Sequence, residues 1–402
     1  MVEWKECTIS DIGIVIGGAT PSTKKNENYD GGMIPWITPK DLSSFSGRYI
    51  KQGERNITEI GLKSCSTQLL PAHSILFSSR APIGYIAIAQ NEVCTNQGFK
   101  SVVPNKDIDY LFLYYLLKYN TEKIEHMGSG TTFKEISGNT MKNIRVKVPV
   151  TIENQKKIAS ILDVIDSKIE KNMQINKNLL HQTRVIFKHW FTDNPNLDTM
   201  KQATLADLCL VVTKGTTPTT LGKTFASEGI NFIKAESILD NHAIDKEKFA
   251  FIDSETNDLL KRSIISSGDI VFTIAGTLGR FALIDDSVLP ANTNQAVAII
   301  RANQSKVTPE YLYSFFLGNW HNDYYTKRIQ QAVQANLSLG TIKSLPIPIL
   351  SDKAMSEYLG IIKPIIAMTK ANELEITRLR AIRDALLPQL MSGELDVSDL
   401  DI

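Results

Sequence analysis

Two long stretches of the chain repeat their apolar residues in steps of three and four positions. These stretches, Thr151–Phe191 and Ser351–Met391, align without a gap when one is shifted by 200 positions. This spacing places the apolar side chains on one face of an α-helix, so each stretch is predicted to be a long amphipathic helix. Pro364 and Pro388 interrupt the second pattern, which predicts a kink or a late start for that helix.

The predicted helices are long in comparison with a small domain. At a rise of 1.5 Å per residue, a stretch of about forty residues spans roughly 60 Å. A helix of that length exceeds what one small domain can cover, so a second helix is expected to pack along it. We therefore predict that the two long stretches form a helix–helix pair.

The segments ahead of each long stretch have a different pattern. They contain short β-branched runs, such as Ile83–Ala89 and Ala296–Ile300, separated by Gly, Pro, Ser and Asn. Such runs are typical of strands joined by turns. Shorter helical patterns begin at Asp109 and Pro309. Each segment is therefore predicted to be a mixed α/β lobe of about 150 residues.

The two lobes repeat each other in sequence. "GGATPST" at Gly17–Thr23 returns as "KGTTPTT" at Lys214–Thr220, and "CTNQGFKSVV" at Cys94–Val103 returns as "ANTNQAVAII" at Ala291–Ile300. The shift between matching stretches stays within a few residues of 200, as it would after loop insertions in a tandem duplication. We predict an α+β protein with a lobe at 1–150, a helix at 151–195, a lobe at 196–350 and a helix with a tail at 351–402.

Composition places the chain among ordinary globular proteins. Its 402 residues include 44 Lys and Arg against 43 Asp and Glu, a net charge of +1 that by itself does not indicate a nucleic-acid binder. The four cysteines are scattered, without metal-ligand spacing. No signal peptide or membrane-spanning run is visible, so a cytoplasmic protein is expected.

The sequence shows no legible catalytic site. "GTTPTTLGKT" at Gly215–Thr224 ends like a phosphate-binding loop, but Thr217 stands where that loop needs a glycine. The six histidines form no metal-binding cluster, and no nucleophile, base and orienting residue fall into a known pattern. We predict that the chain is not an enzyme by itself and holds no metal.

Several stretches, in order along the chain, resemble the specificity subunits of Type I restriction–modification enzymes. They include "GGATPSTKKNENYDGGMIPWITPKDL", "CTNQGFKSVVP", "GSGTTFKEISGNTMKNIRVKVP", "ENQKKIASILDVID" and "LLPQLMSGELDV". The resemblance spans essentially the whole chain. Each motif alone is weak, and the resemblance depends on their number and their order along the chain.

The resemblance implies a fold and a set of partners. Each lobe would be a target recognition domain that reads one half of a bipartite double-stranded DNA sequence. The long helices would pack as an antiparallel coiled coil with pseudo-twofold symmetry, set the spacing between the half-sites, and dock two modification (methyltransferase) subunits, with restriction (translocase–nuclease) subunits joining. S-adenosylmethionine and the N6-adenine methylation would belong to the modification subunit, so this chain would need no cofactor.

The duplication suggests which residues contact DNA. Positions shared by both lobes are expected to be scaffold or phosphate contacts, whereas base-reading positions should be polar and should differ. The candidates in lobe 1 (residues 1–150) are Lys40, Ser78, Ser79, Arg80, Asn96, Gln97, Lys100, Thr131, Thr132 and Lys134. The candidates in lobe 2 (residues 196–350) are Lys214, Thr216, Thr273, Arg280, Asn294, Gln295, Gln331, Gln334 and Asn336.

Each candidate set has a structural alternative. The shared Asn-Gln pairs fit a side-chain clamp on a turn better than a DNA contact, and Arg80 could form an internal salt bridge. Partner-binding positions are predicted where the helices carry apolar residues beyond one seam, and burial against the lobes is the alternative for them. These positions are Phe187, Trp190, Phe191, Leu386, Leu387 and Leu390.

Two alternatives to DNA recognition remain for the whole chain. One is an interaction scaffold of duplicated lobes that binds no nucleic acid. The other is a methyltransferase that acts alone, for which the sequence offers no S-adenosylmethionine pocket.

Overall fold

The protein is described by a computed structural model that covers residues 1–80, 82–128, 134–329 and 336–398. The chain forms two compact units, unit 1 with residues 1–171 and 375–402 and unit 2 with residues 172–374. Unit 1 contains lobe 1 and unit 2 contains lobe 2, and residues of both long helices belong to each unit.

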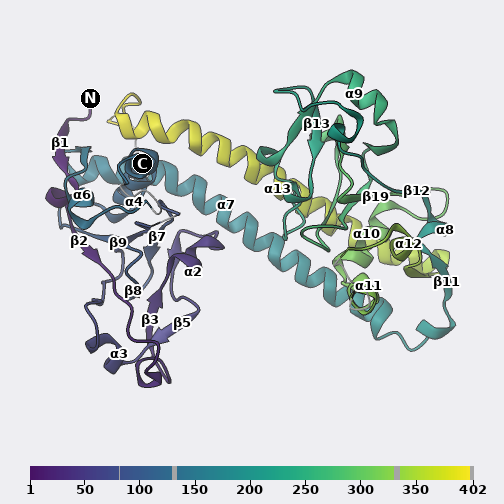
Figure 1. Ribbon diagram of the computed structural model, residues 1–402, viewed down its shortest axis with the longest axis horizontal. Coiled ribbons are helices and arrows are strands. Elements are labelled where there is room, and N and C mark those ends of the chain that lie inside the picture. Colours follow the sequence, from purple (N-terminus) through teal and green to yellow (C-terminus); the bar gives the residue numbers. More distant parts are fainter. Residues whose placement is uncertain (81, 129–133, 330–335, 399–402) are drawn as a thin grey trace. The chain divides into compact units, whose positions relative to one another are not determined.

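The strands of unit 1 are β1 (Trp4–Thr8), β2 (Gly13–Gly17), β3 (Ile34–Ile37), β4 (Tyr49–Ile50), β5 (Arg55–Ile57), β6 (Ile75–Phe77), β7 (Ile86–Ala89), β8 (Cys94–Thr95), β9 (Lys100–Pro104) and β10 (Arg145–Pro149). Its short helices are α1 (Ile9–Ile12), α2 (Pro39–Ser43), α3 (Glu59–Lys63), α4 (Tyr110–Tyr119), α5 (Thr121–His126) and α6 (Gly138–Lys142). One sheet has the order β2-β9-β6-β7-β4 and a second has the order β5-β3-β8 (Figure 1).

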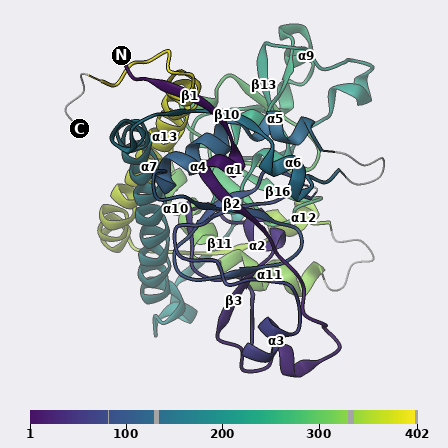
Figure 2. The same cartoon turned by 90° about the vertical axis from the view of Figure 1, so that its left-hand side faces the viewer.

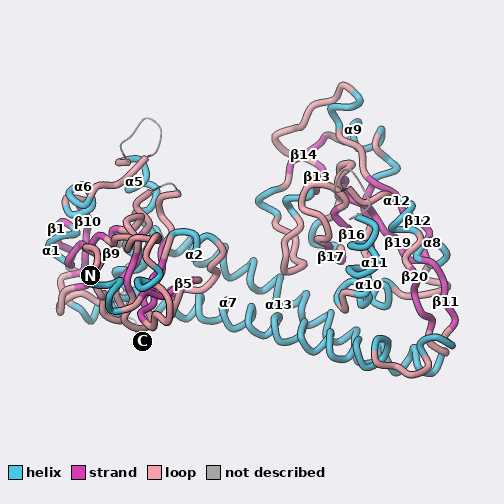
Figure 3. The backbone as a smooth tube through the Cα atoms, turned by 60° about the horizontal axis from the view of Figure 1, so that its bottom comes forward, coloured by secondary structure: helices cyan, strands magenta, loops and turns pink. Residues whose placement is uncertain are grey.

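The strands of unit 2 are β11 (Lys201–Thr204), β12 (Cys209–Lys214), β13 (Ile230–Ile233), β14 (Ala250–Ile252), β15 (Ile264–Ile265), β16 (Ile270–Thr273), β17 (Phe281–Leu283), β18 (Ala291–Thr293), β19 (Val297–Ala302) and β20 (Pro346–Ile349). Its short helices are α8 (Leu205–Leu208), α9 (Ser254–Leu259), α10 (Pro309–Leu317), α11 (Trp320–Ile329) and α12 (Leu339–Lys343). The sheets have the orders β12-β19-β16-β17 and β14-β13-β18-β15, drawn in magenta in Figure 3.

The two lobes share one topology. The series β2-β9-β6-β7 of lobe 1 corresponds to β12-β19-β16-β17 of lobe 2, and β5-β3-β8 corresponds to β14-β13-β18. In both lobes the second sheet contains one parallel pair, β3 with β8 and β13 with β18. Lobe 1 adds β4 beside β7, and lobe 2 adds β15 beside β18. The duplication predicted from the sequence is therefore visible strand by strand.

A two-stranded sheet closes each lobe before its long helix begins. In unit 1 the first strand β1 pairs antiparallel with the last strand β10 (Figure 2). In unit 2, β11 pairs with β20 in the same way. The backbone donors and acceptors at the two ends of each lobe thus satisfy one another, and the long helix leaves from a fixed point.

Each lobe buries one short apolar helix behind its main sheet. On α4, Phe112, Leu113 and Leu116 are buried, and the side chain of Asp109 accepts a hydrogen bond from the backbone N–H of Phe112 at 2.9 Å. The equivalent α10 begins after Thr308, whose hydroxyl caps it in the same way. A helix with buried residues on nearly every side lies in a core, here between the sheet and the long helix.

The long helices are α7 (Ile152–Phe187), continued by a π-helical turn at Lys188–Thr192, and α13 (Asp352–Ser392). The sequence predicted a kink or a late start for the second helix, and the late start is wrong, because α13 begins at Asp352. The helix continues from there through Pro364 and Pro388 as one element. Each proline removes one backbone hydrogen bond. Next to Pro364, the buried side chains of Ile362 and Ile366 anchor the helix in the core of unit 2.

The long helices pack antiparallel within each unit. In unit 1, Asp166 of α7 accepts a hydrogen bond from Arg383 of α13 at 2.9 Å. In unit 2, the amide of Asn372 donates to Asn176 Oδ1 at 2.7 Å, while Trp190 lies 5.5 Å from Tyr358 between ring centroids. As the residue numbers increase along α7, those of their contacts on α13 decrease, which confirms the predicted antiparallel helix pair. No helix in the described part of the chain is long and apolar enough to cross a membrane.

Candidate nucleic-acid interface

The Thr-Asn-Gln stretch of lobe 1 holds the loop that follows β2. The carbonyl of Thr95 accepts a hydrogen bond from the N–H of Ala19 at 3.0 Å, and Asn96 Oδ1 accepts one from the N–H of Gly98 at 2.9 Å. The hydroxyl of Thr20 donates to Gln97 Oε1. The two segments are so close that a Cβ on Gly18 would lie 2.2 Å from the carbonyl oxygens of Thr95 and Asn96.

Lobe 2 builds the same turn from the equivalent residues. The carbonyl of Thr293 accepts from the N–H of Thr216 at 3.2 Å, Asn294 Oδ1 accepts from the N–H of Ala296 at 3.1 Å, and Thr217 donates to Gln295. A Cβ on Gly215 would lie 2.0 Å from the Thr293 carbonyl. These contacts agree with the clamp interpretation of the shared tripeptide. The side chains of Gln97 and Gln295 nevertheless remain exposed beside the clamp.

Three polar residues predicted to contact DNA are buried inside the lobes. Ser78, Ser79 and Thr273 have 0% relative exposure. Ser78 Oγ accepts a hydrogen bond from the N–H of Tyr85 at 2.8 Å, and Thr273 Oγ1 accepts one from the N–H of Arg280 at 2.9 Å. Each hydroxyl therefore closes the equivalent hairpin of its own lobe. This is a correction to the prediction, because a buried hydroxyl does not reach a base, and those of Ser78 and Thr273 are in addition bound within their own hairpins. We leave these three residues out of the proposed DNA-contacting set.

Two cations of lobe 1 share one carboxylate. Arg80 Nε lies 3.1 Å from Glu135 Oε2, and Lys100 Nζ lies 3.7 Å from Glu135 Oε1. The side chain of Arg80 is 46% exposed, so this salt bridge is of the weak, solvent-accessible kind. In lobe 2 the positions of Arg80 and Lys100 are Ala275 and Ala298, and that of Glu135 is Asn336, which is exposed.

The other predicted phosphate contacts differ in how firmly they are held. Lys40 lies 2.8 Å from Glu54, with both side chains largely exposed. Arg280 is held more tightly, since its guanidinium forms two 2.7 Å hydrogen bonds with Asp240. Lys134 and Lys214 are exposed, and Thr216 Oγ1 accepts from Arg262 at 3.1 Å. The candidates Thr131, Thr132, Gln331 and Gln334 lie outside the described residues.

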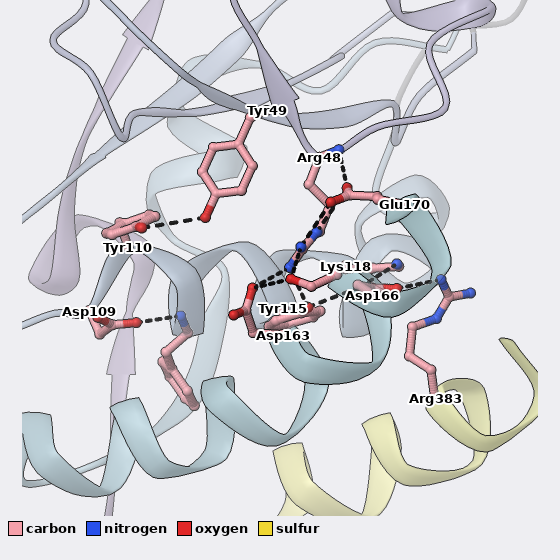
Figure 4. Close-up of polar contacts among 12 residues, drawn as sticks. Arg48, Tyr49, Asp109, Tyr110, Tyr115, Lys118, Asp163, Asp166, Glu170 and Arg383 are labelled. Atoms are coloured by element: carbon pink, nitrogen blue, oxygen red, sulfur yellow. Dashed lines mark hydrogen bonds and ion pairs between the residues drawn. The ribbon is translucent and has the colours of Figure 1, made fainter. Parts of the chain in front are cut away.

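A polar network joins lobe 1 to α7 (Figure 4). Arg48, from the loop before β4, has only 6% of its side chain exposed. Its guanidinium donates to Asp163 at 2.6 Å, to both oxygens of Glu170 at 3.0 Å, and to Ser167 at 2.8 Å. The backbone N–H of Arg48 also donates to Glu170 at 2.9 Å. Burial lowers the pKa of Arg48, but the hydrogen bonds to Glu170 and Asp163 outweigh this effect and raise it.

The network continues from α4 through α7 to α13. The hydroxyl of Tyr115 accepts from Arg48 at 3.2 Å and donates to Asp166 at 2.9 Å. Asp166 also bonds Arg383, and Lys118 lies 4.0 Å from it. Burial lowers the pKa of Lys118. Arg48 was not among the residues predicted from the sequence, because its carboxylate partners lie more than a hundred residues further along the chain.

Comparison with known proteins identifies the family. A family model described as the Type I restriction modification DNA specificity domain matches residues 1–181 and again residues 198–378. The chain belongs to this specificity family. It is 32% identical over 420 residues to the type I restriction enzyme MjaIX specificity subunit of Methanocaldococcus jannaschii, an alignment that covers 99% of this chain and 95% of that protein.

Two further comparisons agree. The EcoR124I/EcoR124II specificity subunit of Escherichia coli is 34% identical over 172 residues, which cover 41% of each chain. Among solved structures, the S subunit of a Type-I restriction-modification system from M. genitalium matches with a TM-score of 0.59 at 17% identity, over 97% of this chain and 96% of that chain. The latter shows a shared fold, and the predicted family and fold class are confirmed.

Family membership defines the role of the chain in outline. Proteins of the specificity family are the DNA-recognition component of type I restriction–modification systems and not the catalytic one, and they act with methyltransferase and restriction subunits. The chain is accordingly a sequence-specific DNA-recognition subunit. In the described part of the chain, no group of three or more His, Cys, Asp or Glu side chains is placed to hold a metal ion.

The apolar residues predicted to bind partners of this specificity subunit lie mainly in its own cores. Phe187 and Phe191 are 1% and 0% exposed in the core of unit 2, where Trp190 packs on Tyr358. In unit 1, Leu387 and Leu390 are buried and Leu386 packs partly buried against them. The prediction is corrected for the buried members, since the ends of the long helices cover the apolar faces of the lobes.

Proposed function

We propose that the chain recognises a bipartite DNA sequence, with one half read by each lobe. The observation that carries this proposal is the duplication itself. Both lobes hold the same turn with the same Thr-Asn-Gln clamp, yet the side chains around the clamp differ in charge. A shared scaffold with different polar side chains suits two readers of different base pairs.

The side chains proposed to contact DNA are polar and at least partly exposed, with 16% of the Lys100 side chain accessible. In lobe 1 they are Gln97, Arg80, Lys100 and Lys134, with Lys40 as a phosphate contact. Arg80 has the best chemistry for base reading, because a guanidinium can donate two parallel hydrogen bonds to guanine once Glu135 releases it. In lobe 2 they are Lys214, Thr216, Gln295 and Asn336. Arg280 is a weaker candidate, since Asp240 already occupies its two parallel donors.

We also propose that the long helices set the half-site spacing and dock two methyltransferase subunits, which restriction subunits then join. Several large apolar side chains on these helices are exposed, including Val164 at 66%, Ile361 at 44% and Met368 at 54%. Met355, Leu359 and Pro364 line a hollow on α13 in unit 2. Exposed apolar side chains on a helix suit a protein partner. Phosphate contacts made by such partners would also account for binding by a chain with a net charge of only +1.

Replacement of Arg80 by Gln tests the half-site assignment. Loss of a bidentate arginine–guanine contact costs about 1–3 kcal/mol, or roughly 5- to 150-fold in discrimination. We expect R80Q to weaken or relax recognition of one half-site and to leave the other half unchanged. The measurement is a map of methylated adenines in cells that carry the cognate methyltransferase, supported by gel-shift competition with duplexes altered in either half.

Lys147→Gln is the matched control, because Lys147 is an exposed lobe 1 cation paired with Glu6 on the two-stranded sheet. It should leave the methylation map unchanged. Equal effects of R80Q on both half-sites would contradict the assignment of one lobe to each half. Indifference to DNA in the presence of the methyltransferase would instead support a scaffold without nucleic-acid binding.

A further inference from the structure

The two lobes rest on their long helices through charges of opposite sign. Lobe 1 supplies a cation, Arg48, to the carboxylates of Asp163 and Glu170 on α7. The gap-free repeat of the helices places Lys363 and Lys370 of α13 at the positions of Asp163 and Glu170, 200 residues further on.

Lobe 2 supplies the anions to these lysines. Glu310, at the start of α10, lies 3.7 Å from Lys363, and Asp285, just after β17, lies 3.8 Å from Lys370. Lys370 is only 19% exposed, and it also pairs with Glu373 at 3.2 Å. In the contact with lobe 1, the helix α7 therefore carries the negative charges. In the contact with lobe 2, the helix α13 carries the positive charges.

The residues around the ion pairs change together with the charges. Tyr115 and Asp166, which extend the Arg48 network, correspond to Phe316 and Ile366 in the repeat. Both of these are buried in the apolar core of unit 2. The contact of lobe 1 with α7 thus adds a polar network around the buried Arg48 to an apolar core that includes Ile158 and Leu162. That of lobe 2 is apolar, with ion pairs at its edge.

We propose that this inversion of charge keys each lobe to its own helix. A duplicated chain whose lobes share one topology could place either lobe on either helix while it folds. Arg48 set against Lys363 and Lys370 would be a buried cation facing two lysines in place of two carboxylates, with Glu373 as the anion beside Lys370. Glu310 and Asp285 set against Asp163 and Glu170 would be like charges in contact. Placing lobe 1 on α13 and placing lobe 2 on α7 are therefore both unfavourable. Such repulsion against the wrong pairing creates specificity for the right one.

The proposal concerns assembly within the chain and goes beyond the proposed function, because it holds whether or not the lobes read half-sites. Its test uses the full-length chain without DNA. The double variant D163K/E170K gives α7 the lysines of α13. We expect it to lower the thermal midpoint of unit 1 by about 5–10 °C and to speed hydrogen exchange of β4 and the loop before it.

The decisive measurement is rescue by a third substitution. Adding R48E to D163K/E170K restores opposite charges with both signs exchanged, and we expect it to recover at least a third of the lost midpoint and to slow exchange at β4 again. K147E, which reverses an exposed lobe 1 charge away from the helix, should change neither quantity. Absence of rescue, or a D163K/E170K chain as stable as the parent, would overturn the proposal.

Single substitutions cover the case in which the double variant does not fold. E170Q removes the carboxylate charge at constant shape, whereas E170K reverses it. Keying by charge predicts a clearly larger loss for E170K than for E170Q. Equal losses would show that hydrogen-bond geometry, and not the sign of the charge, holds lobe 1 to α7, and would likewise overturn the proposal.

Discussion

Single glycines fix the close approach of two segments in each lobe. Gly18 and Gly215 lie directly under the carbonyl groups of the Thr-Asn-Gln turn, where a Cβ would come within 2.2 and 2.0 Å of backbone oxygen. Backbone atoms cannot move aside as the tip of a side chain can. The space at these two positions, and not their backbone angles, therefore requires glycine.

Replacement of Gly18 by Ala is expected to destabilise unit 1 by about 2 kcal/mol or more, because the added methyl group must displace the turn. Urea unfolding of the full chain measures the loss. The neighbouring Gly17→Ala is the matched control, since a Cβ there meets only ordinary contacts at 3.9 Å or more. Equal stabilities of G18A and G17A would contradict this account of the turn.

At the scale of elements, the apolar ends of the long helices pack mainly against the lobes and not against a partner. Phe191, in the π-helical turn that continues α7, lies 4.7 Å from Phe315 and 5.2 Å from Tyr358 between ring centroids. It thus connects α10, α7 and α13 in one core. Apolar surface left for partners lies instead on the outward side of the helices, for example at Val185, which is 56% exposed.

Phe191→Ala is expected to lower the stability of unit 2 in the isolated chain by about 3–5 kcal/mol, the usual cost of deleting a buried aromatic ring. Val185→Ala, on the same helix but exposed, should change stability by less than about 0.5 kcal/mol. Chemical denaturation without partner subunits measures both. If F191A lost partner binding and kept its stability, the residue would be a docking position after all.

At the scale of the whole molecule, the duplicated units differ in their cores. Unit 2 packs two histidines around Phe281, the half-buried His242 at 4.0 Å and the buried His321 at 5.5 Å between ring centroids. The pKa of each is lowered to about 4, mainly by burial, and for His242 also by the charge of Arg184. Since the charged form is disfavoured in the folded state, both histidines fold as neutral rings.

This difference predicts that unit 2 is the more acid-sensitive unit. A folded pKa of about 4, below the ordinary value of 6.5, gives stability that is complete above pH 6.5 and is lost as the pH falls toward 4. Each histidine accounts for about 3 kcal/mol across that range. Hydrogen exchange between pH 7 and pH 4 should show unit 2 opening first. His321→Phe should remove about half of the loss, and an unchanged profile in H321F would contradict the assignment.

Much of this protein follows from its sequence alone. The period of the apolar residues defines the long helices, and the repeat defines two lobes of one topology, because backbone pattern and duplication are properties of local sequence. The shared Asn96 and Asn294 also indicated a clamp. The inversion of charge between the two helices is also visible in the sequence, since the gap-free repeat changes Asp163 to Lys363 and Glu170 to Lys370.

Only the tertiary structure decided which side chains face inward. Ser78 and Arg80 lie two positions apart, yet one closes a hairpin and the other lies at the surface beside Glu135. The sequence predicted Phe187 to be a docking residue, but the structure buries it in the core of unit 2. The carboxylate partners of Arg48 are more than a hundred residues away. Burial and ion pairing depend on segments brought together by folding, and no local pattern specifies them.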